Sequence, residues 1–409
     1  MKALKLSLLL SLLSSTVVLA NENNNTLDSY ISDFKQQEFG YDYEKNEAES
    51  SKLRDSWIAP LNLNYSYSKS NPYDSDQKTQ SAAIKMDQPI FQSGGIYYGI
   101  KFANASKLYS DYSIDVAKRK MIKDTISILM QIKQTAFKIE AQKLQIINSD
   151  INLAQKKEQY LSGQLDSGFL DNAIIQRNIV ISALYDIETA QQKLINQFSI
   201  LSDLDYETAT IPHLEYMSSE EFIKHNIVLK QNDAIISKND YYKNVTISKY
   251  LPRVSLTAGY NWSKSENRAI GTGIQLQPDD ITYYDYGIRA SMPLDINTFR
   301  DIESVKVDYL KSKVVRQDKQ RELEALFTQV LHNIENYEKK IELSNENIKL
   351  YTKLSEDTNN LFAAGYKTQY DVDTLKNSLE IQTIDTRVYE IDKQLELLNL
   401  YEMYVNEGE

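Results

Sequence analysis

Apolar residues recur at helical spacing along two long stretches of this chain. Ile126, Leu129 and Ile132 belong to the first stretch (residues 100–162), and a similar stripe runs through the second (residues 294–364). Neither stretch contains Gly or Pro. At about 1.5 Å per residue, a helix of this length reaches roughly 100 Å. The pattern therefore predicts two amphipathic helices that are longer than the helices of a compact domain.

A glycine-containing turn follows each long helix, and a second breaker-poor amphipathic segment then runs back. The turns are found in the sequences SGQLDSGFLD and LFAAGYKTQYD. Gly168 and Gly365 suit the positive-φ position that closes a helix. We predict two helical hairpins, at about residues 95–203 and 298–405.

Four short segments alternate apolar and polar residues and predict β-strands, at about residues 61–69, 81–91, 252–263 and 283–294. The polar faces carry charged and small residues. The apolar faces carry aromatic residues that gather toward the loop-proximal ends: Tyr65, Tyr67, Tyr260, Trp262, Tyr284 and Tyr286. Pro89 and Pro293 mark the places where a strand gives way to a helix, because proline removes a ladder donor and disfavours helix for the residue before it.

The whole unit occurs twice along the chain. YSYSKS (residues 65–70) returns as YNWSKS (residues 260–265), and the surrounding pattern of helix, strand, loop, strand, long helix, turn and helix returns with it. The predicted organisation is a first repeat at 21–203, a connector in an equatorial position at 204–219, and a second repeat at 220–409. The leading helices of the two repeats are expected at about residues 27–57 and 218–250.

Composition and charge exclude several classes of protein. Residues 1–20 have the layout of a secretory signal peptide, with two lysines, a short apolar run and a small-residue cleavage site. The chain contains no Cys, so no disulfide can crosslink it, and its net charge of −11 argues against a nucleic-acid partner. The three histidines are widely spaced without paired acids, and no catalytic or phosphate-binding motif occurs. We expect neither an enzyme, nor a metal site, nor a cofactor.

Strands with one apolar and one polar face can cover a soluble core or line a membrane barrel. Aromatic residues near the strand ends fit a girdle at a membrane interface, and the polar faces fit a wet lumen. Four strands cannot close a barrel, whereas three copies would supply twelve. The alternative is a secreted or periplasmic coiled-coil assembly without a membrane channel, in which the sheets cap the helices.

The sequence resembles the TolC family of outer-membrane efflux proteins over nearly all of the chain from about residue 27. The residues that carry the resemblance are KYLPRVSLTAGYNWS, the junctions DQPIFQSGG and SMPLDI, and LFAAGYKTQYDVDTLKNSL. It implies a mainly α fold with membrane β: a homotrimer whose twelve-stranded outer-membrane β-barrel continues as a long α-helical coiled-coil tunnel in the periplasm. It implies a gated passive exit duct for a tripartite efflux pump or a type I secretion system, with a periplasmic adaptor protein, an inner-membrane transporter and outer-membrane lipid as partners.

The resemblance also assigns roles to residues at the tips of the hairpins. The adaptor-docking turns map onto Ser167, Gly168 and Phe169, and onto Ala364, Gly365 and Tyr366. An acidic ring that narrows the tip maps onto Asp371, while Asp373 lies one residue away from the place of a second acid. Lys367 takes the place of a basic residue that holds the tip shut, and Asp171 is its candidate partner. From the residues alone, Asp371 and Asp373 can equally be solvated acids near a helix N-terminus.

Overall fold

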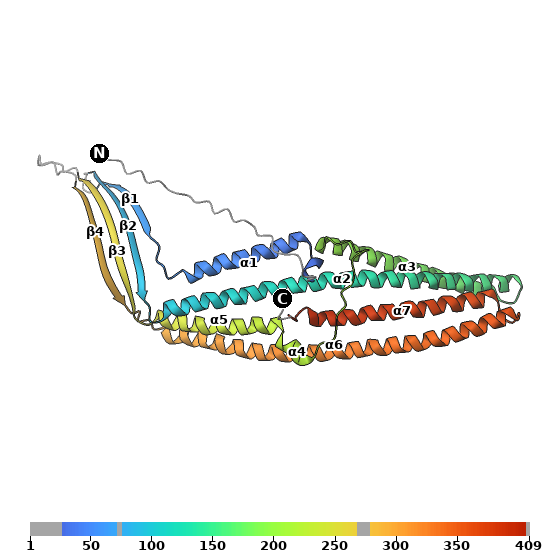
Figure 1. The fold of residues 1–409 in the computed structure, drawn as a ribbon. Helices are drawn as coiled ribbons and strands as arrows, with labels where there is room; N and C mark the ends of the chain where they lie inside the picture. Colours follow the sequence, from blue (N-terminus) through green and yellow to red (C-terminus); the bar gives the residue numbers. More distant parts are fainter. Residues whose placement is uncertain (1–26, 72–75, 268–278, 406–409) are drawn as a thin grey trace.

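The computed structural model describes residues 27–71, 76–267 and 279–405. The predicted signal peptide lies outside the described residues. One long layer of helices carries a four-stranded sheet at one end and two hairpin tips at the other (Figure 1). The described C-terminal residues lie near the middle of the layer (Figure 1).

Two helices run through most of the length of this layer. They are α2 (Gly95–Leu161) and α6 (Thr298–Ala363), of 67 and 66 residues. On the side of the sheet, α1 (Asp33–Arg54) and α5 (Ile227–Lys249) flank them; toward the tips, α3 (Ser167–Leu201) and α7 (Gln369–Tyr401) do so. The two hairpins are therefore α2–α3 and α6–α7.

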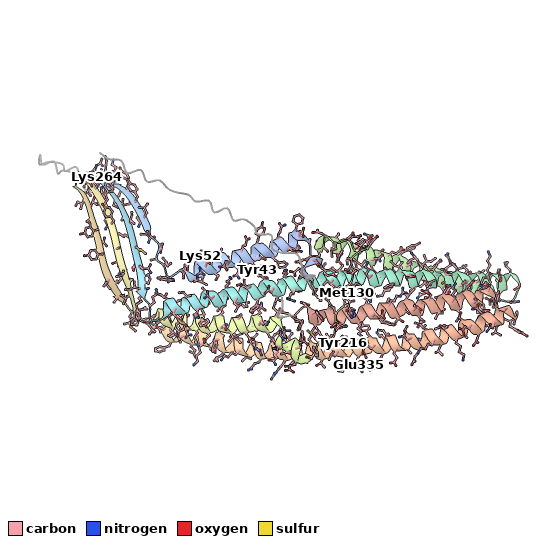
Figure 2. The ribbon with its side chains drawn as sticks, viewed as in Figure 1. Tyr43, Lys52, Met130, Tyr216, Lys264 and Glu335 are labelled. Atoms are coloured by element: carbon pink, nitrogen blue, oxygen red, sulfur yellow. The ribbon has the colours of Figure 1, made fainter. Side chains whose placement is uncertain are left out.

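The core lies at the middle of the layer, where α2, α6 and α7 meet. Ile126 and Met130 of α2, Val330 of α6 and Leu398 of α7 are each at most 1% exposed and belong to one cluster. Met130 lies near the centre of α2 (Figure 2). Burial of these stripes stabilises the helices by about 1.5–3 kcal/mol for each large side chain.

The two leading helices are shorter and more broken than predicted. The first repeat starts with a 3-10 helix, η1 (Leu27–Tyr30), before α1; the second starts with the short α4 (Ser219–Lys224) before α5. Ser32 accepts a hydrogen bond from the Lys35 amide, and Asn226 accepts from two amides at the start of α5. These N-caps begin new helices, because a capping side chain satisfies backbone donors that a continuous helix would use.

Residues 202–218 cross the layer from α3 to α4 (Figure 1). The backbone of Leu214 exchanges hydrogen bonds with the Gln394 side chain of α7, at 2.9 and 3.4 Å. Tyr216, which is labelled in Figure 2, donates to a Glu338 carboxylate oxygen of α6 at 2.6 Å. This segment ties α6 and α7 together near the middle of the layer.

The sheet has the order β1-β2-β3-β4, and every neighbouring pair is antiparallel. The strands are β1 (Asn62–Ser70), β2 (Gln77–Phe91), β3 (Arg253–Asn267) and β4 (Asp279–Ser291). β2 and β4 start four residues earlier than predicted and β3 ends four later. The added residues pair in register, for example Thr79 with Ser265. Their sequence does not alternate cleanly between apolar and polar residues, so the pattern did not predict them as strand.

Candidate functional site

One face of the sheet is apolar and carries all six predicted aromatic residues. The register places Tyr65 and Trp262 in one row of paired residues and Tyr260 beside Tyr284, and it puts Tyr67 and Tyr286 on the same face. Their exposure runs from 54% for Tyr67 to 82% for Tyr286, apart from the half-buried Trp262. No helix of the described chain covers this face (Figure 1). A solvated surface of this kind marks an interaction site.

The aromatic residues are more widely spread along the strands than the sequence predicted. Tyr67 and Trp262 lie toward the loops, whereas Tyr65 lies near the middle of β1. Tyr260, Tyr284 and Tyr286 also lie near the middle of their strands, because β3 and β4 extend further than predicted. The Tyr284 and Tyr286 rings stack with centroids 6.4 Å apart.

The opposite face of the sheet is polar and internally bonded. The Arg289 guanidinium lies 2.9 Å from the Asp87 carboxylate, and Asn261 donates to Asp285 at 2.6 Å. A Cβ added at Gly259 would lie 2.5 Å from an Asp285 oxygen, so that a larger residue here would have to displace this carboxylate. Such a face suits contact with water.

The predicted junction prolines lie on either side of the strand ends. Pro89 is inside β2, two residues before its end, beside a register irregularity between Pro89 and Phe91. Pro293 follows the last residue of β4 by two positions, and α6 begins five residues later. Both prolines therefore lie within two residues of a strand end, but neither is the boundary residue itself.

The sheet and the helix layer both end in unpartnered surfaces. β1 and β4 are the two edges of the sheet, and each lacks a neighbour on one side within the described chain. Toward the tips, α3 and α6 are the outer helices of the layer (Figure 1). They expose apolar residues at helical spacing: Ile175 and Ile179 on α3, and Leu343, Leu350 and Leu354 on α6. Open sheet edges and exposed apolar stripes mark surfaces suited to interaction with other chains.

The two hairpin tips are built alike. Gly163 (φ 73°) and Gly365 (φ 79°) adopt the left-handed conformation that ends α2 and α6. The prediction of a positive φ is confirmed for Gly365 and wrong for Gly168. Gly168 lies in the first turn of α3 and donates its N–H to the Asp166 side chain, which caps that helix. The helix-closing glycine of the first tip is Gly163.

This correction changes which residues of the two tips correspond. Ser162, Gly163 and Gln164 take the positions of Ala364, Gly365 and Tyr366. Ser167, Gly168 and Phe169 begin α3, just as Gln369, Tyr370 and Asp371 begin α7. The first repeat therefore places Phe169 where the second has the acid Asp371.

Asp371 closes a capping box at the start of α7. Its carboxylate accepts hydrogen bonds from the amide and the hydroxyl of Thr368, both at 2.9 Å, and the Thr368 hydroxyl in turn accepts from the Asp371 amide. The Thr368 backbone and side chain, and then the charge of Lys367, lower the pKa of Asp371. Asp371 therefore remains anionic at neutral pH. Asp373 accepts from Gln369 at 2.8 Å.

The contact between the two hairpins at the tip differs from the predicted pair. Lys367 and Asp171, both described, make no ion pair within this chain. Instead, Tyr370 of α7 donates to the Glu158 carboxylate of α2 at 3.0 Å. This bond is the first cause of a raised pKa for the Tyr370 phenol. Further from the tip, Asn377 donates to Asn148 at 2.8 Å.

Removal of the capping hydroxyl at the tip should loosen the start of α7. We expect Thr368→Ala to cost about 1 kcal/mol of local stability. The amides of residues 369–372 should then exchange hydrogen about fivefold faster. The control is Thr328→Ala, which removes an exposed hydroxyl bonded to the Glu324 carbonyl inside α6. Unchanged exchange in Thr368→Ala would contradict the capping role.

The same cap predicts a pH dependence. Because the pKa of Asp371 is lowered in the folded chain, the stabilisation is fully present above the ordinary carboxyl pKa of about 3.9. It is lost as the pH falls through the lower folded value. Exchange at these amides, corrected for intrinsic rates, should therefore be equal at pH values of about 5 and 7 and rise only below about 3.5.

Among the described helices, none is long and apolar enough to cross a membrane. Within residues 27–71, 76–267 and 279–405, no group of three or more His, Cys, Asp or Glu residues could hold a metal ion.

Solved structures of outer-membrane channels have the same fold. VceC, an outer membrane protein of Vibrio cholerae, is 12% identical over 93% of this chain and 95% of its own, with a TM-score of 0.70. The Campylobacter jejuni CmeC outer membrane channel is 12% identical over 92% and 84%, with a TM-score of 0.72. The open state of the Neisseria gonorrhoeae MtrE outer membrane channel is 10% identical over 92% and 87%, with a TM-score of 0.64.

No protein-family model and no curated protein matches the sequence. At these identities the structural likeness establishes the fold. The predicted class, mainly α with four strands per chain, is confirmed, and the resemblance seen in the sequence holds at the level of the fold.

Proposed function

We propose that this protein is an outer-membrane channel-tunnel that serves as the exit duct of a tripartite efflux pump or a type I secretion system. The observation that carries the proposal is the four-stranded sheet, with one exposed aromatic face, one polar face and two open edges, continued by helical hairpins. The likeness of the whole chain to the fold of solved outer-membrane channels supports the same proposal.

The open edges of the sheet support a homotrimer. β1 and β4 run antiparallel to each other, so β4 of one copy can pair with β1 of the next in the manner of the pairs inside the chain. Three copies supply twelve strands and close the barrel, which removes every edge. The apolar stripes of α3 and α6 meet in the same ring and close the tunnel wall.

The exposed aromatic face supports contact between the sheet and membrane lipid. The alternative is a coiled-coil assembly in which the sheet caps the helices. In that alternative the apolar face of the sheet would cover the helices. In the structure the sheet bends away from them, and Tyr284 and Tyr286 remain 74% and 82% exposed (Figure 1). Outer-membrane lipid is the partner that suits this face, with the helical tunnel in the periplasm.

The hairpin tips are the proposed meeting point with a periplasmic adaptor protein, which joins the duct to an inner-membrane transporter. The candidate docking residues of the first tip now include Ser162, Gly163 and Gln164 beside Ser167, Gly168 and Phe169. Those of the second remain Ala364, Gly365 and Tyr366. In this proposal the duct is a passive conduit that needs no cofactor and performs no chemistry.

Asp371, three copies of which would surround the threefold axis, is the proposed acidic constriction at the tip. Because the Thr368 cap holds its carboxylate, one residue has both a structural and an electrostatic role. The latch between Lys367 and Asp171 can form only between copies, since it is absent within the chain. Lys367→Ala should then raise the conductance of single channels. An unchanged conductance would contradict the proposed latch.

The first test is physical isolation of the assembly. The cell envelope is fractionated, the protein is extracted in mild detergent, and the mass of its protein part is measured by light scattering. We expect recovery from the outer membrane at three times the mass of the mature chain, and conductance after insertion into a planar bilayer. A particle that is soluble without detergent would overturn the proposal in favour of the coiled-coil assembly.

A further inference from the structure

Apart from Asp279, the first residue of β4, the charged residues of the polar face of the sheet lie together at its helical end. They occupy four adjacent rows of paired residues: Lys85 and Asp87 on β2, Arg253 on β3, and Asp285 and Arg289 on β4. Toward the loops, the described side chains of the same face are uncharged, mainly Ser, Thr and Asn. The charge therefore forms a band beside the helices.

Both acids of this band already have partners. Asp87 pairs with Arg289 at 2.9 Å, and Asp285 accepts from Asn261 at 2.6 Å. Arg253 donates from Nε to the Ser291 hydroxyl at 2.8 Å, which orients its guanidinium across the end of β4. Among the described residues, no carboxylate makes an ion pair with Lys85 or Arg253. The band has an excess of positive charge.

Assembly of the barrel would leave this excess in place. The polar face of β1, which would lie beside β4 of the next copy, carries only Asn and Ser: Asn62, Asn64, Ser66, Ser68 and Ser70. No acid from that strand can neutralise the band. Three copies would bring six cations without an ion-pair partner to the helical end of the barrel, with Lys85 and Arg253 at opposite ends of the band.

We propose that these residues, here called the basic collar (Lys85, Arg253 and Arg289), form an anion-selecting site where the barrel joins the tunnel. This inference rests on the proposed channel function and adds a selectivity element to it. Rings of Lys and Arg favour anions in pores, and the planar guanidinium suits carboxylate and phosphate groups. The ligands are small anions and solutes that carry such groups.

The collar has the opposite sign to the tip. A solute leaving the tunnel passes the Asp371 constriction first and the basic collar second, close to the membrane. The collar attracts the anionic groups of a solute that has already entered, which lowers the barrier to the barrel. Because its cations are exposed to water, salt screens them, and their effect is largest at low ionic strength.

The experiment measures reversal potentials of the purified full-length trimer in a planar bilayer under a KCl gradient. We expect Arg253→Gln with Lys85→Gln to lower the ratio of anion to cation permeability at least about twofold at 10 mM salt. The change should largely disappear at about 1 M. Asn62→Lys adds a cation in the row of Lys85 and should shift the ratio in the opposite direction.

The matched control is Lys78→Gln, which makes the same change on β2 but on the apolar face. It should leave the ratio unchanged. Conducting channels whose ratio does not respond to the collar variants or to Asn62→Lys would overturn the collar and leave the channel intact. Wild-type protein that inserts without conducting would overturn the proposed function itself, and the collar with it.

Discussion

Replacement of Phe222 by alanine should destabilise the protein by about 3–5 kcal/mol. Phe222 is fully buried, although it lies on α4, a helix of only six residues. Its ring stacks on Phe327 of α6 with centroids 5.6 Å apart, inside the cluster that joins α2, α6 and α7. Truncation leaves a cavity that the surrounding long helices cannot fill, because each is fixed along its whole length.

The measurement is denaturant unfolding in detergent, followed by far-ultraviolet circular dichroism at one fixed protein concentration, because assembly contributes to stability. The control is Phe169→Ala at the tip, where the side chain is 54% exposed. It should change stability by no more than about 0.5 kcal/mol. A loss below about 1 kcal/mol for Phe222→Ala would show that α4 does not anchor the middle of the layer.

The order of the elements was predictable because long helices and two-faced strands have different periods. The stripe of Ile126, Leu129 and Ile132 predicted α2, and all three residues are buried as the stripe requires. Alternation likewise predicted which strand residues share a face, and the register confirms it. Periodicity carries this information because it reflects burial along a whole element.

The ends of elements were less predictable because single side chains decide them. Gly168 and Gly163 both follow the same helix, and the N-cap at Asp166 is what places Gly168 inside α3. Asp before Ser-Gly is an N-cap signal that could have corrected this prediction. Asn226 gives a similar signal at the start of α5.

Contacts between distant residues had no signal in the sequence. Glu158 and Tyr370 are 212 positions apart, and no sequence motif links the two positions. The same is true of the pair Asp87 and Arg289, on strands from different repeats. Only the docking of the two repeats brings these groups together.

Loss of the bond between Tyr370 and Glu158 should open the tip. We expect Tyr370→Phe to raise single-channel conductance by roughly threefold or more, because the narrowest part of a pore dominates its resistance. The change removes the hydroxyl that joins α7 to α2 and keeps the ring. The bond between Asn377 and Asn148 remains and confines the opening to the end of the hairpins.

The partner residue makes this prediction specific to the bond. Glu158→Gln should raise conductance less, since a neutral acceptor binds the phenol more weakly than a carboxylate. Tyr370→Phe combined with Glu158→Ala should behave like Tyr370→Phe alone, because both changes remove the same contact. Tyr366→Phe changes an 80% exposed tyrosine in the neighbouring turn and should have no effect. Additive effects of the two changes would mean that Tyr370 and Glu158 act separately, and the tip would then be held shut by contacts between copies.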